Sequence, residues 1–372
     1  MRIAQIAKYW SDSITGGMPI ASRTLAVALA KRGHEVVSYT SAGPAQFTDH
    51  GVRVVKLPGH GMTLEFAENI KGVKTSDFDV ILSESGTGIP LFDKATRPVR
   101  LVRMHGMSLD YIQTWLNMTV LGESRDWKVD AGIDVRDKYN QVIHEIRDLR
   151  KADRVIAISD STFNDMVLRM HLQNVSLIYN PVDTDLFKPA DTTPGFRLIT
   201  TSMLHEVKAV EEAIWVAHTA GYPLTVVGTG SEEPRLRELA RKLRANVLFK
   251  GAVPHERMPD EYATASVFID TSAHHSGLNL TALEAMACGK PVIGSDTGGK
   301  RSYGCASLYP MGDIEEGARC VRRLMENQDE LVMRSGVARE HAVVTFSLDK
   351  ICEKYERLIE QVKEEKNREH ER

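Results

Sequence analysis

The sequence predicts an α/β protein made of two Rossmann-like, doubly wound domains that face each other across a cleft. Three observations carry this prediction. Short apolar strands alternate with helical patterns through the first half of the chain, a proline-containing break follows at 180–191, and the alternation then begins again. Two successive β/α arrays predict two parallel sheets. The length of 372 residues is enough for two domains of roughly 150 residues each.

The composition is that of an ordinary globular protein. Lysine and arginine (47) nearly balance aspartate and glutamate (50), so the overall charge does not favour a nucleic-acid partner. No apolar run reaches the roughly 18 residues of a transmembrane helix, and residues 1–13 lack the apolar core of a secretory signal. We therefore expect a cytoplasmic protein. Its cysteines have no metal-ligand spacing, which predicts free thiols and no structural zinc; they are Cys288, Cys305, Cys320 and Cys352.

The first half of the chain opens with a βαβ unit. An apolar strand over 1–7 precedes a loop that contains Gly16 and Gly17, and a helical pattern then ends at Lys31-Arg32-Gly33. A glycine after basic residues is a common helix C-terminus. A second strand is expected over 34–40. Further strands are expected at 52–57, 80–83, 99–104 and 154–159.

The charged stretch 108–150 departs from this regular alternation. It contains Trp115 and Trp127 and ends in an expected helix over 136–149. We interpret it as the variable part of the first domain, which shapes the acceptor site. Its mildly basic and aromatic content would suit a lipid-linked acceptor, so a peripheral association with the inner face of a membrane stays open.

Prolines and turn-forming residues at 180–191 predict a linker between the two arrays. We expect an N-terminal domain over 1–186 and a C-terminal domain over 187–347. A final helix should begin at Leu348, pack back toward the N-terminal domain, and end in a charged tail at 363–372 that is solvated or frayed. Strands of the second array are expected at 196–202, 224–227, 247–249, 267–269 and 291–295.

The most informative stretch runs from Gly277 to Gly299. A glycine turn leads into a helix that should begin near Asn279 to Thr281, and Gly289-Lys290-Pro291 ends that helix before a buried strand. The free N–H groups and the positive dipole end of a helix suit an anionic phosphate. Glu284 lies one turn further along, where its carboxylate can accept hydrogen bonds from a ribose diol. Taken alone, Glu284 could equally be a solvated helix residue.

This stretch resembles the hallmark of the family 4 (group 1) retaining glycosyltransferases of GT-B fold. That hallmark has two glutamates separated by seven residues, an Ala-Met-Ala run, a Gly-x-Pro turn, an apolar strand and Asp-x-Gly-Gly. The resemblance covers nearly the whole chain. The matching segments are Glu284 to Ala287, Gly289 to Val292, Asp296 to Gly299, the domain-joining segment Asn180 to Pro189, the strand Ala152 to Ser159, the glycine turn Val226 to Gly230 and the base-binding loop Phe249 to Val253.

The resemblance implies a role for each matching position. Glu284 would hold the ribose hydroxyls, His105 would position a hydroxyl of the donor sugar and stabilise developing charge, and Lys208 would stabilise the departing nucleotide diphosphate. Gly16 and Gly17 would let a loop of the first domain approach the donor phosphates. The remaining donor-binding positions are Ala252 and Val253 at the base, and Ser276, Gly277, Leu278, Asn279, Leu280 and Thr281 at the diphosphate and sugar.

Two positions depart from the family pattern. Ser276 stands where the first glutamate of the pair is expected, so the donor sugar loses a carboxylate partner. Met203 stands where an arginine normally assists Lys208, and the loss of a charged hydrogen bond is worth on the order of 1.5–3 kcal/mol. Lys300 and Arg301 are candidates to supply the missing charge, although both could also be exposed surface cations.

The resemblance implies a retaining hexosyltransferase that uses a UDP- or GDP-sugar as co-substrate. The acceptor would be a glycan, a lipid-linked sugar or a small molecule. No cofactor or metal is expected, because no Asp-x-Asp motif stands where a metal-dependent transferase would use one. Domain closure would exclude water and assemble the site.

Other functions share parts of this pattern. Sugar-nucleotide epimerases and glycan phosphorylases have the same two-domain architecture but need their own acid/base set or cofactor lysine. An NAD-dependent dehydrogenase fits less well, because the first glycine loop does not match GxGxxG. The changes at Ser276 and Met203 favour a further alternative, a non-catalytic glycosyltransferase-like protein that binds sugar nucleotides or serves as a partner subunit.

Overall fold

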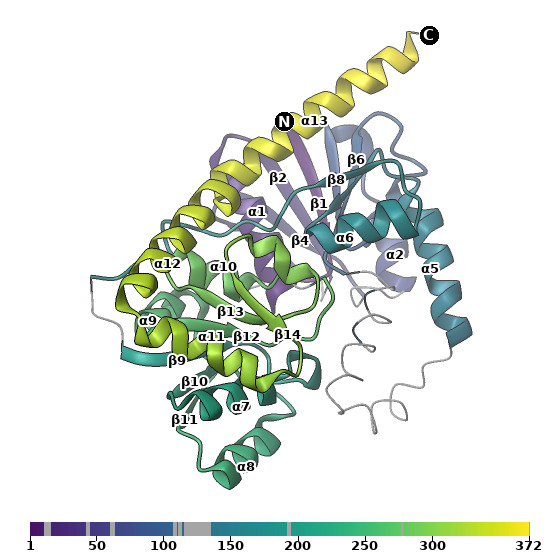
Figure 1. The fold of residues 1–372 in the computed structure, drawn as a ribbon. Coiled ribbons are helices and arrows are strands. Elements are labelled where there is room, and N and C mark those ends of the chain that lie inside the picture. The colour runs from purple at the N-terminus through teal and green to yellow at the C-terminus, as the bar shows by residue number, and fades with distance from the viewer. Residues whose placement is uncertain are drawn as a thin grey trace. The chain divides into compact units, whose positions relative to one another are not determined.

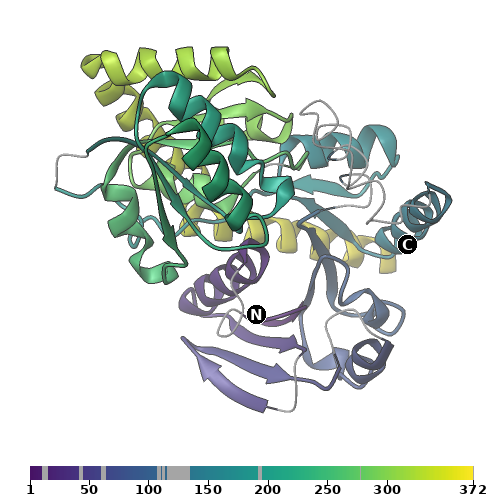
Figure 2. The same ribbon diagram turned by 90° about the horizontal axis from the view of Figure 1, so that it is seen from below.

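The computed structural model describes residues 1–10, 16–41, 45–59, 64–106, 110, 114, 135–191, 195–276 and 278–371. These residues form two compact units, which are described separately. The first unit comprises the described residues of Met1–Leu109, Asp134–Pro181 and Leu348–Arg372, and the second comprises those of Asp110–Ile133 and Val182–Ser347. Figures 1 and 2 show the ribbons of both units, coloured along the chain.

Within the described residues, the first unit contains an eight-stranded sheet that is parallel except for its edge strand β3. The central strand β1 is buried at five of its six positions, as expected of a parallel sheet that is covered on both faces. In spatial order the strands are β3 (Ala45–Asp49), β4 (Val52–Lys56), β2 (Glu35–Thr40), β1 (Arg2–Ala7), β5 (Val80–Glu84), β6 (Val99–Met104), β7 (Arg154–Ala157) and β8 (Val175–Leu177).

Helices cover both faces of this sheet. Because successive residues of a strand point to opposite faces, Ile3 packs with one helical layer and its neighbour Ala4 with the other. Helices α1 (Gly17–Lys31) and α13 (Leu348–His370) pack in the Ile3 layer, and Figure 2 shows α1 along the strands of this unit. The other helical segments are α2 (Leu64–Ile70), η1 (Thr75–Asp77), η2 (Ile89–Leu91), α5 (Val135–Leu149), α6 (Asp160–Asn164) and the π-helical turn η3 (Asp165–Arg169).

The second unit contains a six-stranded sheet in which every described pair is parallel. Side chains of α7, α8 and α11 form one apolar layer against it. In spatial order its strands are β11 (Val247–Gly251), β10 (Leu224–Val227), β9 (Gly195–Thr201), β12 (Ala265–Asp270), β13 (Val292–Asp296) and β14 (Ser307–Pro310). Its helical segments are η4 (Glu206–Lys208), α7 (Val210–Ala220), α8 (Glu233–Leu243), η5 (His255–Arg257), α9 (Met258–Ala263), α10 (Leu280–Ala287), η6 (Gly299–Tyr303), α11 (Ile314–Glu326), α12 (Gln328–His341) and the π-helical turn η7 (Ala342–Phe346).

Each sheet has one point at which the strand order reverses. In the first unit this point lies between β1 and β5, and in the second it lies between β9 and β12. In open parallel sheets, ligands bind outside the carboxyl ends of the strands at such a switch point, because the two connecting loops diverge there to opposite faces. The residues that follow these four strands are therefore the expected place for a ligand site in each unit.

The boundary between the units differs from the expected one. The expected division falls after Leu186, whereas the structure divides the chain after Pro181. Asp110 and Thr114, which were expected in the first domain, also belong to the second unit. The backbone N–H of Val182 donates to the carbonyl of Phe346 at 2.8 Å, and Arg339 of α12 donates to the carbonyls of Thr184 and Phe187 at 3.1 and 2.8 Å. These long-range hydrogen bonds attach 182–187 to the second unit.

The charged C-terminal segment is helical over more of its length than expected. Helix α13 continues to His370, although a solvated or frayed tail was predicted from Lys363 onward. The ammonium of Lys366 donates to the carbonyl of Pro98 at 2.9 Å and pairs with Asp153 at 3.1 Å. These contacts with the first unit stabilise the last turns. Within the described residues, no helix combines the length and the apolarity needed to cross a bilayer.

Candidate functional site

The start of α10 leaves backbone donors without a partner among the described residues. Asn279 precedes the helix with extended backbone angles (φ −71°, ψ 131°), and its side chain does not cap the helix. Its amide Nδ2 donates instead to both carboxylate oxygens of Asp270, at 3.1 and 2.9 Å. No group in the described part of the chain accepts a hydrogen bond from the backbone N–H of Leu280 or Thr281. This end of the helix is therefore suited to bind an anion.

Asp270, the last residue of β12, organises the start of α10. Besides the amide of Asn279, its carboxylate accepts the hydroxyl hydrogen of Tyr303 at 2.8 Å. The Tyr303 oxygen in turn accepts the backbone N–H of Asn279 at 2.9 Å. The carbonyl of Asp270 accepts from the buried ammonium of Lys300 at 2.9 Å. This buried network fixes the orientation of Asn279 and keeps it from capping the helix itself.

Lys208 reaches the same place from the carboxyl end of β9. Its Nζ lies 3.4 Å from Oδ1 of Asn279. Burial lowers the pKa of the Lys208 ammonium, Asp270 opposes this change, and Lys300 adds to it. The pKa of His274 falls to about 4, mainly through burial and further through Lys208. The ammonium groups of Lys208 and of the buried Lys300, beside a free helix N-terminus, create a positive electrostatic potential, which a phosphate would relieve.

Glu284 is held by two side chains of the same unit. Its Oε1 accepts from Nε2 of His255 at 2.8 Å, and its Oε2 accepts from the hydroxyl of Tyr262 at 2.9 Å. Glu284 is only 2% exposed, and the ring of His255 lies tilted by 58° against that of Phe187, with centroids 5.2 Å apart. A carboxylate offers about four lone-pair sites, so two bonds leave capacity for the hydroxyls of a ligand.

Ala209, directly after Lys208, has a left-handed backbone (φ 44°, ψ 40°). This conformation costs a non-glycine residue roughly 1–2 kcal/mol. Replacing Ala209 by glycine should therefore raise the free energy of unfolding in urea by about 0.5–1 kcal/mol, after the larger entropy of glycine in the unfolded chain is subtracted. The control Ala213→Gly, inside α7, should lower it by about 1 kcal/mol or more. Equal destabilisation by both changes would contradict the strain.

Ser276 lies against the glycine turn that follows β13. A Cβ on Gly299 would come within 2.5 Å of the carbonyl oxygen of His275 and 2.6 Å of that of Ser276. Glycine at 299 is therefore required for this close approach. Ser276 is 8% exposed, and Leu278 follows it with its N–H on the Ser276 carbonyl at 2.7 Å. Gly277, also a candidate, lies outside the described residues.

The two cations proposed to replace the missing arginine are engaged elsewhere. Lys300 is fully buried, and besides Asp270 its Nζ contacts the carbonyl and hydroxyl oxygens of Ser295 at 2.8 and 3.1 Å. Arg301 is exposed and pairs with Asp296 at 2.6 Å. Met203 is 44% exposed. The geometry of Arg301 therefore does not support the expectation that it supplies the lost charge. Lys300 contributes to the site only through its electrostatic potential.

Ala252 and Val253 follow β11, at the same carboxyl edge of the sheet. The neighbouring glycine turn after β10 packs tightly: a Cβ on Gly228 would lie 1.9 Å from the carbonyl oxygen of Ser202, and one on Gly230 would lie 2.3 Å from that of Leu204. Glycines at these positions let the loops after β9 and β10 pack together. The packing of these two loops is therefore enough to explain glycine at both positions.

Gly16 and Gly17 differ from those glycines. Gly16 is extended (φ 162°), a backbone that any residue adopts. A Cβ there would meet only Pro19 Cδ at 3.6 Å, and one on Gly17 would meet nothing within 4 Å. Neither the backbone nor the packing among the described residues requires glycine at the start of α1.

His105 follows β6 in the first unit and contacts a buried ion pair. Its Nε2 lies 2.8 Å from Oε2 of Glu84 and 3.2 Å from Nε of Arg103. Arg103 Nε donates to the same Glu84 oxygen at 2.8 Å. Glu84 ends β5, next to the switch point of this sheet. Sequence reasoning identified His105 but missed Glu84 and Arg103, because their pairing depends on the register of neighbouring strands.

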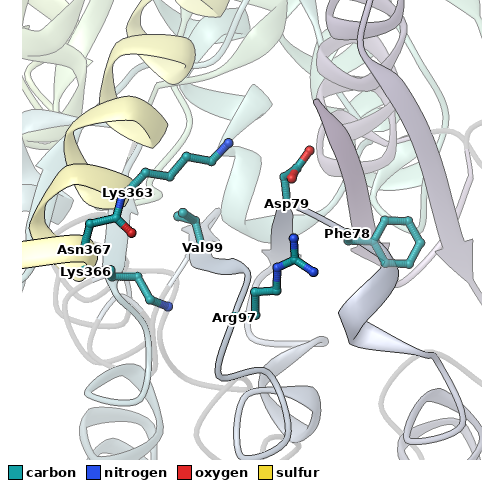
Figure 3. A pocket seen from close by; sticks show the side chains of 7 residues that line it. All are labelled: Phe78, Asp79, Arg97, Val99, Lys363, Lys366 and Asn367. Atoms are coloured by element: carbon teal, nitrogen blue, oxygen red, sulfur yellow. The ribbon is translucent and has the colours of Figure 1, made fainter. Parts of the chain in front are cut away.

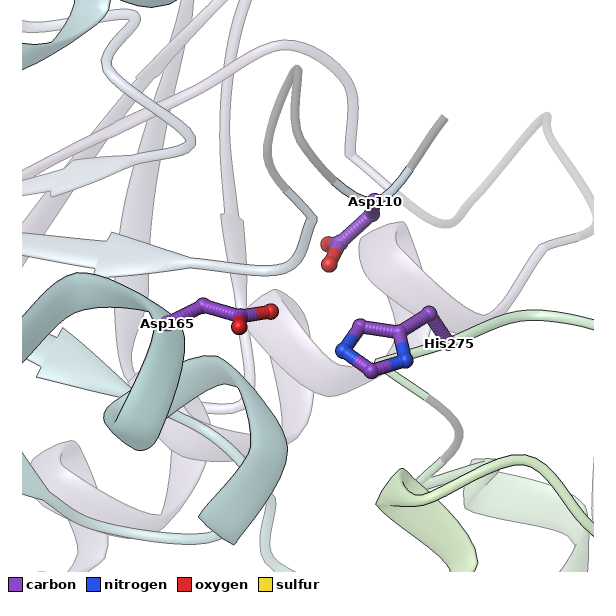
Figure 4. Close-up of side chains that lie close together, drawn as sticks. All are labelled: Asp110, Asp165 and His275. Carbon is purple, nitrogen blue, oxygen red and sulfur yellow. The ribbon is translucent and has the colours of Figure 1, made fainter. Parts of the chain in front are cut away.

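Asp110 and His275 are potential metal ligands of the second unit, with ligand atoms within 4.8 Å of each other (Figure 4). Figure 4 also labels Asp165 of the first unit, which pairs with Arg169 at 3.1 Å. Metal-independent action stays a prediction, tested by activity in the presence of a chelator.

A cavity of about 200 Å³ lies in the first unit, between α13 and the starts of β5 and β6 (Figure 3). It contains none of the expected site residues. Asp79 in its wall already accepts the backbone N–H of Arg2 at 2.8 Å. We interpret this cavity as part of the junction between α13 and the sheet. Its lining residues are Phe78, Asp79, Arg97, Val99, Lys363, Lys366 and Asn367.

Within the second unit, the structure thus brings Lys208 together with Asn279 and the first turn of α10. Glu284 lies one turn along the same helix, while Ala252 and Val253 lie after β11. The residues that sequence reasoning missed here are the supporting ones, Asp270, Tyr303, His255 and Tyr262. The aspartate at the end of a buried strand was a signal that could have indicated the first of them.

Two family models match this chain. The model described as "Glycosyl transferases group 1" matches residues 199–327, and the model described as "Glycosyltransferase Family 4" matches residues 15–186. Together they cover most of both units.

Curated relatives and solved structures agree with these matches. The chain is 24% identical over 80% of its length to a phosphatidylinositol N-acetylglucosaminyltransferase component from Arabidopsis thaliana, covering 68% of that protein. It is 23% identical to the MMP alpha-(1->4)-mannosyltransferase of Mycolicibacterium hassiacum, covering 97% of this chain and 99% of that one. Its fold matches sucrose-phosphate synthase from Thermosynechococcus elongatus with a TM-score of 0.81 at 21% identity, over 97% and 98% of the chains. Anabaena HepE in complex with UDP and glucose matches with a TM-score of 0.72 at 16% identity, over 96% and 99%.

Proposed function

This chain belongs to the group 1, family 4 glycosyltransferases of GT-B fold, and we propose that it moves a hexose from a UDP- or GDP-sugar to an acceptor hydroxyl with retention of the anomeric configuration. Transfer from a nucleotide-sugar donor follows from the family. The identity of the sugar as a hexose, the retention of configuration and the independence of metal ions go beyond the family assignment, and we propose them here.

The start of α10 is the observation that carries the proposal. Unpaired backbone N–H groups, the ammonium of Lys208 and the carboxylate of Glu284 one turn along match a nucleoside diphosphate: donors for the phosphates and an acceptor for the ribose hydroxyls. In the reaction, the bond between C1 of the sugar and the diphosphate oxygen breaks, and the electron pair goes to the diphosphate. The acceptor oxygen bonds to C1, and its proton passes to the diphosphate. Preorganised cations and N–H dipoles stabilise the leaving charge.

The names of the relatives support a hexose donor. One relative is a mannosyltransferase and another an N-acetylglucosaminyltransferase component, and one structural neighbour was solved with UDP and glucose. Retention rests on the resemblance to the retaining family alone. The anomeric configuration of the product, read by NMR, tests retention separately from transfer.

A donor screen tests the proposed function. The intact protein is mixed with UDP-, GDP-, ADP- and TDP-sugars, and thermal unfolding is recorded; a ligand at 100 times its dissociation constant adds roughly 2.7 kcal/mol of stability. Release of the nucleoside diphosphate is then measured with a mixture of glycan, lipid and small-molecule acceptors, with and without EDTA. Stabilisation without release would favour the non-catalytic sugar-nucleotide-binding protein. No stabilisation by any sugar nucleotide would contradict the proposal.

Gly17 offers a test of the loop after β1. Replacing Gly17 by leucine should leave thermal stability unchanged, because a Cβ there meets no described residue within 4 Å. If the donor phosphates approach this loop, the added side chain should raise the KM for the donor about tenfold or more, a cost of about 1.4 kcal/mol. The matched control is Gly336→Leu in α12, where a Cβ also meets nothing within 4 Å. An equal KM in both variants would remove Gly17 from the site.

A further inference from the structure

A buried polar cluster lies behind His105 at the switch point of the first unit. We call Glu84, Arg103 and His105, together with Gln5 and Ser22, the Glu84 cluster. Oε1 of Glu84 accepts the amide of Gln5 at 2.8 Å, while its Oε2 accepts Nε of Arg103 at 2.8 Å. The side chains of Arg103 and Glu84 are 0% and 1% exposed, and that of His105 is 8% exposed. Water therefore contributes little to the placement of protons in this cluster.

The geometry offers the imidazole two arrangements. Nε2 of His105 can donate to Oε2 of Glu84 at 2.8 Å, or it can accept from Nε of Arg103 at 3.2 Å. Arg103 Nε carries a single hydrogen, and its shorter contact, 2.8 Å, is with the Glu84 oxygen. A hydrogen bond to a carboxylate is also the stronger type. Both comparisons favour a proton on Nε2.

We infer that Glu84 is a positioning residue that holds the proton of His105 on Nε2. Nδ1 is then presented as an acceptor for a hydroxyl of the donor sugar, a role that rests on the proposed function. No residue in the described part of the chain hydrogen-bonds to Nδ1 of His105. Nε2 is hydrogen-bonded to Glu84. A hydrogen bond at one ring nitrogen is how proteins usually set the tautomer of a histidine.

Burial and the charge of Arg103 keep the imidazole of His105 neutral. Burial lowers the pKa of His105, Arg103 lowers it further, and Glu84 opposes both. Burial raises the pKa of the Glu84 carboxyl, but Arg103 and His105 outweigh it and bring this pKa to about 2. Burial lowers the pKa of the Arg103 guanidinium, but Glu84 and, after it, Tyr355 of α13 outweigh burial and hold this pKa above its usual range. At neutral pH the cluster thus contains a carboxylate, a guanidinium and an uncharged imidazole.

This arrangement defines what His105 can do. A neutral ring with its proton engaged by Glu84 has one free lone pair and no free N–H. It can accept a hydrogen bond from a sugar hydroxyl and stabilise positive charge that develops on the sugar, whereas it cannot donate a proton to the leaving group. The hydrogen bond therefore runs in one direction, from a hydroxyl of the donor sugar to Nδ1 of His105.

The tautomer can be measured directly in the intact, unmodified protein. Long-range proton–nitrogen NMR of protein labelled with nitrogen-15 histidine distinguishes the two neutral forms and the charged ring. The His105→Gln variant identifies the resonance. We expect the proton on Nε2 at neutral pH. A proton on Nδ1, with Nε2 accepting from Arg103, or a charged ring would overturn the inference.

The same spectra test the cause. In Arg103→Met, the pKa of His105 should rise by about one unit or more, because a nearby like charge shifts a pKa by this order; in Glu84→Gln it should fall, and the Nε2–H form should lose its predominance. If either single variant fails to fold, the double variant Glu84→Gln/Arg103→Met removes both charges together. The matched control is Arg100→Met, also on β6, where Arg100 pairs with Asp153 at 2.6 Å. An equal shift of His105 in the control would refute the role of the Glu84 cluster.

Kinetics separate this inference from the proposed function. With donors that each lack one hydroxyl, wild-type protein should lose about five- to tenfold in kcat/KM at one position, whereas His105→Ala should lose nothing further there. The NMR result does not depend on turnover. A Nδ1–H ring in a chain that transfers sugar would refute the inference alone. A Nε2–H ring in a chain that binds no sugar nucleotide would refute the proposed function alone.

Discussion

Replacing Lys208 by methionine is expected to lower kcat for sugar transfer by about 10²–10³-fold, the usual cost of removing one preorganised group that stabilises a transition-state charge. Methionine keeps most of the length of the side chain but removes the ammonium that lies beside Asn279 and the start of α10. With Met203 in place of an arginine, Lys208 is the remaining cation of the expected pair. Its loss should therefore appear mainly in kcat, measured as the initial rate of nucleoside diphosphate release.

The matched control for this change is Lys290→Met. Lys290 is another largely buried lysine of the second unit, and burial lowers its pKa as well. It lies in the turn after α10, at the opposite end of that helix from Asn279. Its replacement should leave kcat within about twofold. A similar loss of kcat in both variants would show that the effect of Lys208 is general to buried lysines of this unit.

Replacing Glu284 by glutamine is expected to raise the KM for the donor by about 10–150-fold, which corresponds to the loss of roughly 1.5–3 kcal/mol from a charged hydrogen bond. Glutamine has the same shape, but its amide nitrogen cannot accept a hydrogen bond. If the carboxylate holds the ribose in both the ground state and the transition state, kcat should change little. Steady-state kinetics at varied donor concentration separates the two constants.

Glu212→Gln is the control for Glu284. Glu212 is a buried carboxyl of α7, and burial raises its pKa, although Lys300 opposes this. A glutamine should substitute for it without effect on the donor KM. The outcome that would contradict a ribose-binding role is a Glu284→Gln variant with the KM of the wild type. A fall in thermal stability without a change in KM would assign Glu284 to structural support of His255 and Tyr262.

Much of the fold could be predicted because its signals are local. The strands β1, β6 and β10 agree with their expected ranges to within one residue, since each is a short apolar run bounded by turn residues. The strands β3, β8 and β14 were not expected. They lie at or near sheet edges, with two or more exposed or half-buried positions each, so their sequences lack the continuous apolar pattern of a buried strand.

The candidate site divides in the same way. By itself, the sequence determined a helix start near Asn279 to Thr281, the position of Glu284 one turn later, and the order of motifs that placed Lys208 and His105 after strands. These features depend on residues close together in the chain. Only the tertiary structure decided that Asn279 is held by Asp270, that Lys300 is buried rather than exposed, and that His105 meets Glu84 and Arg103. Those contacts depend on which strands are neighbours and on the register in which they pair. The sequence does not show which distant residue forms the hydrogen bond with a given buried polar side chain.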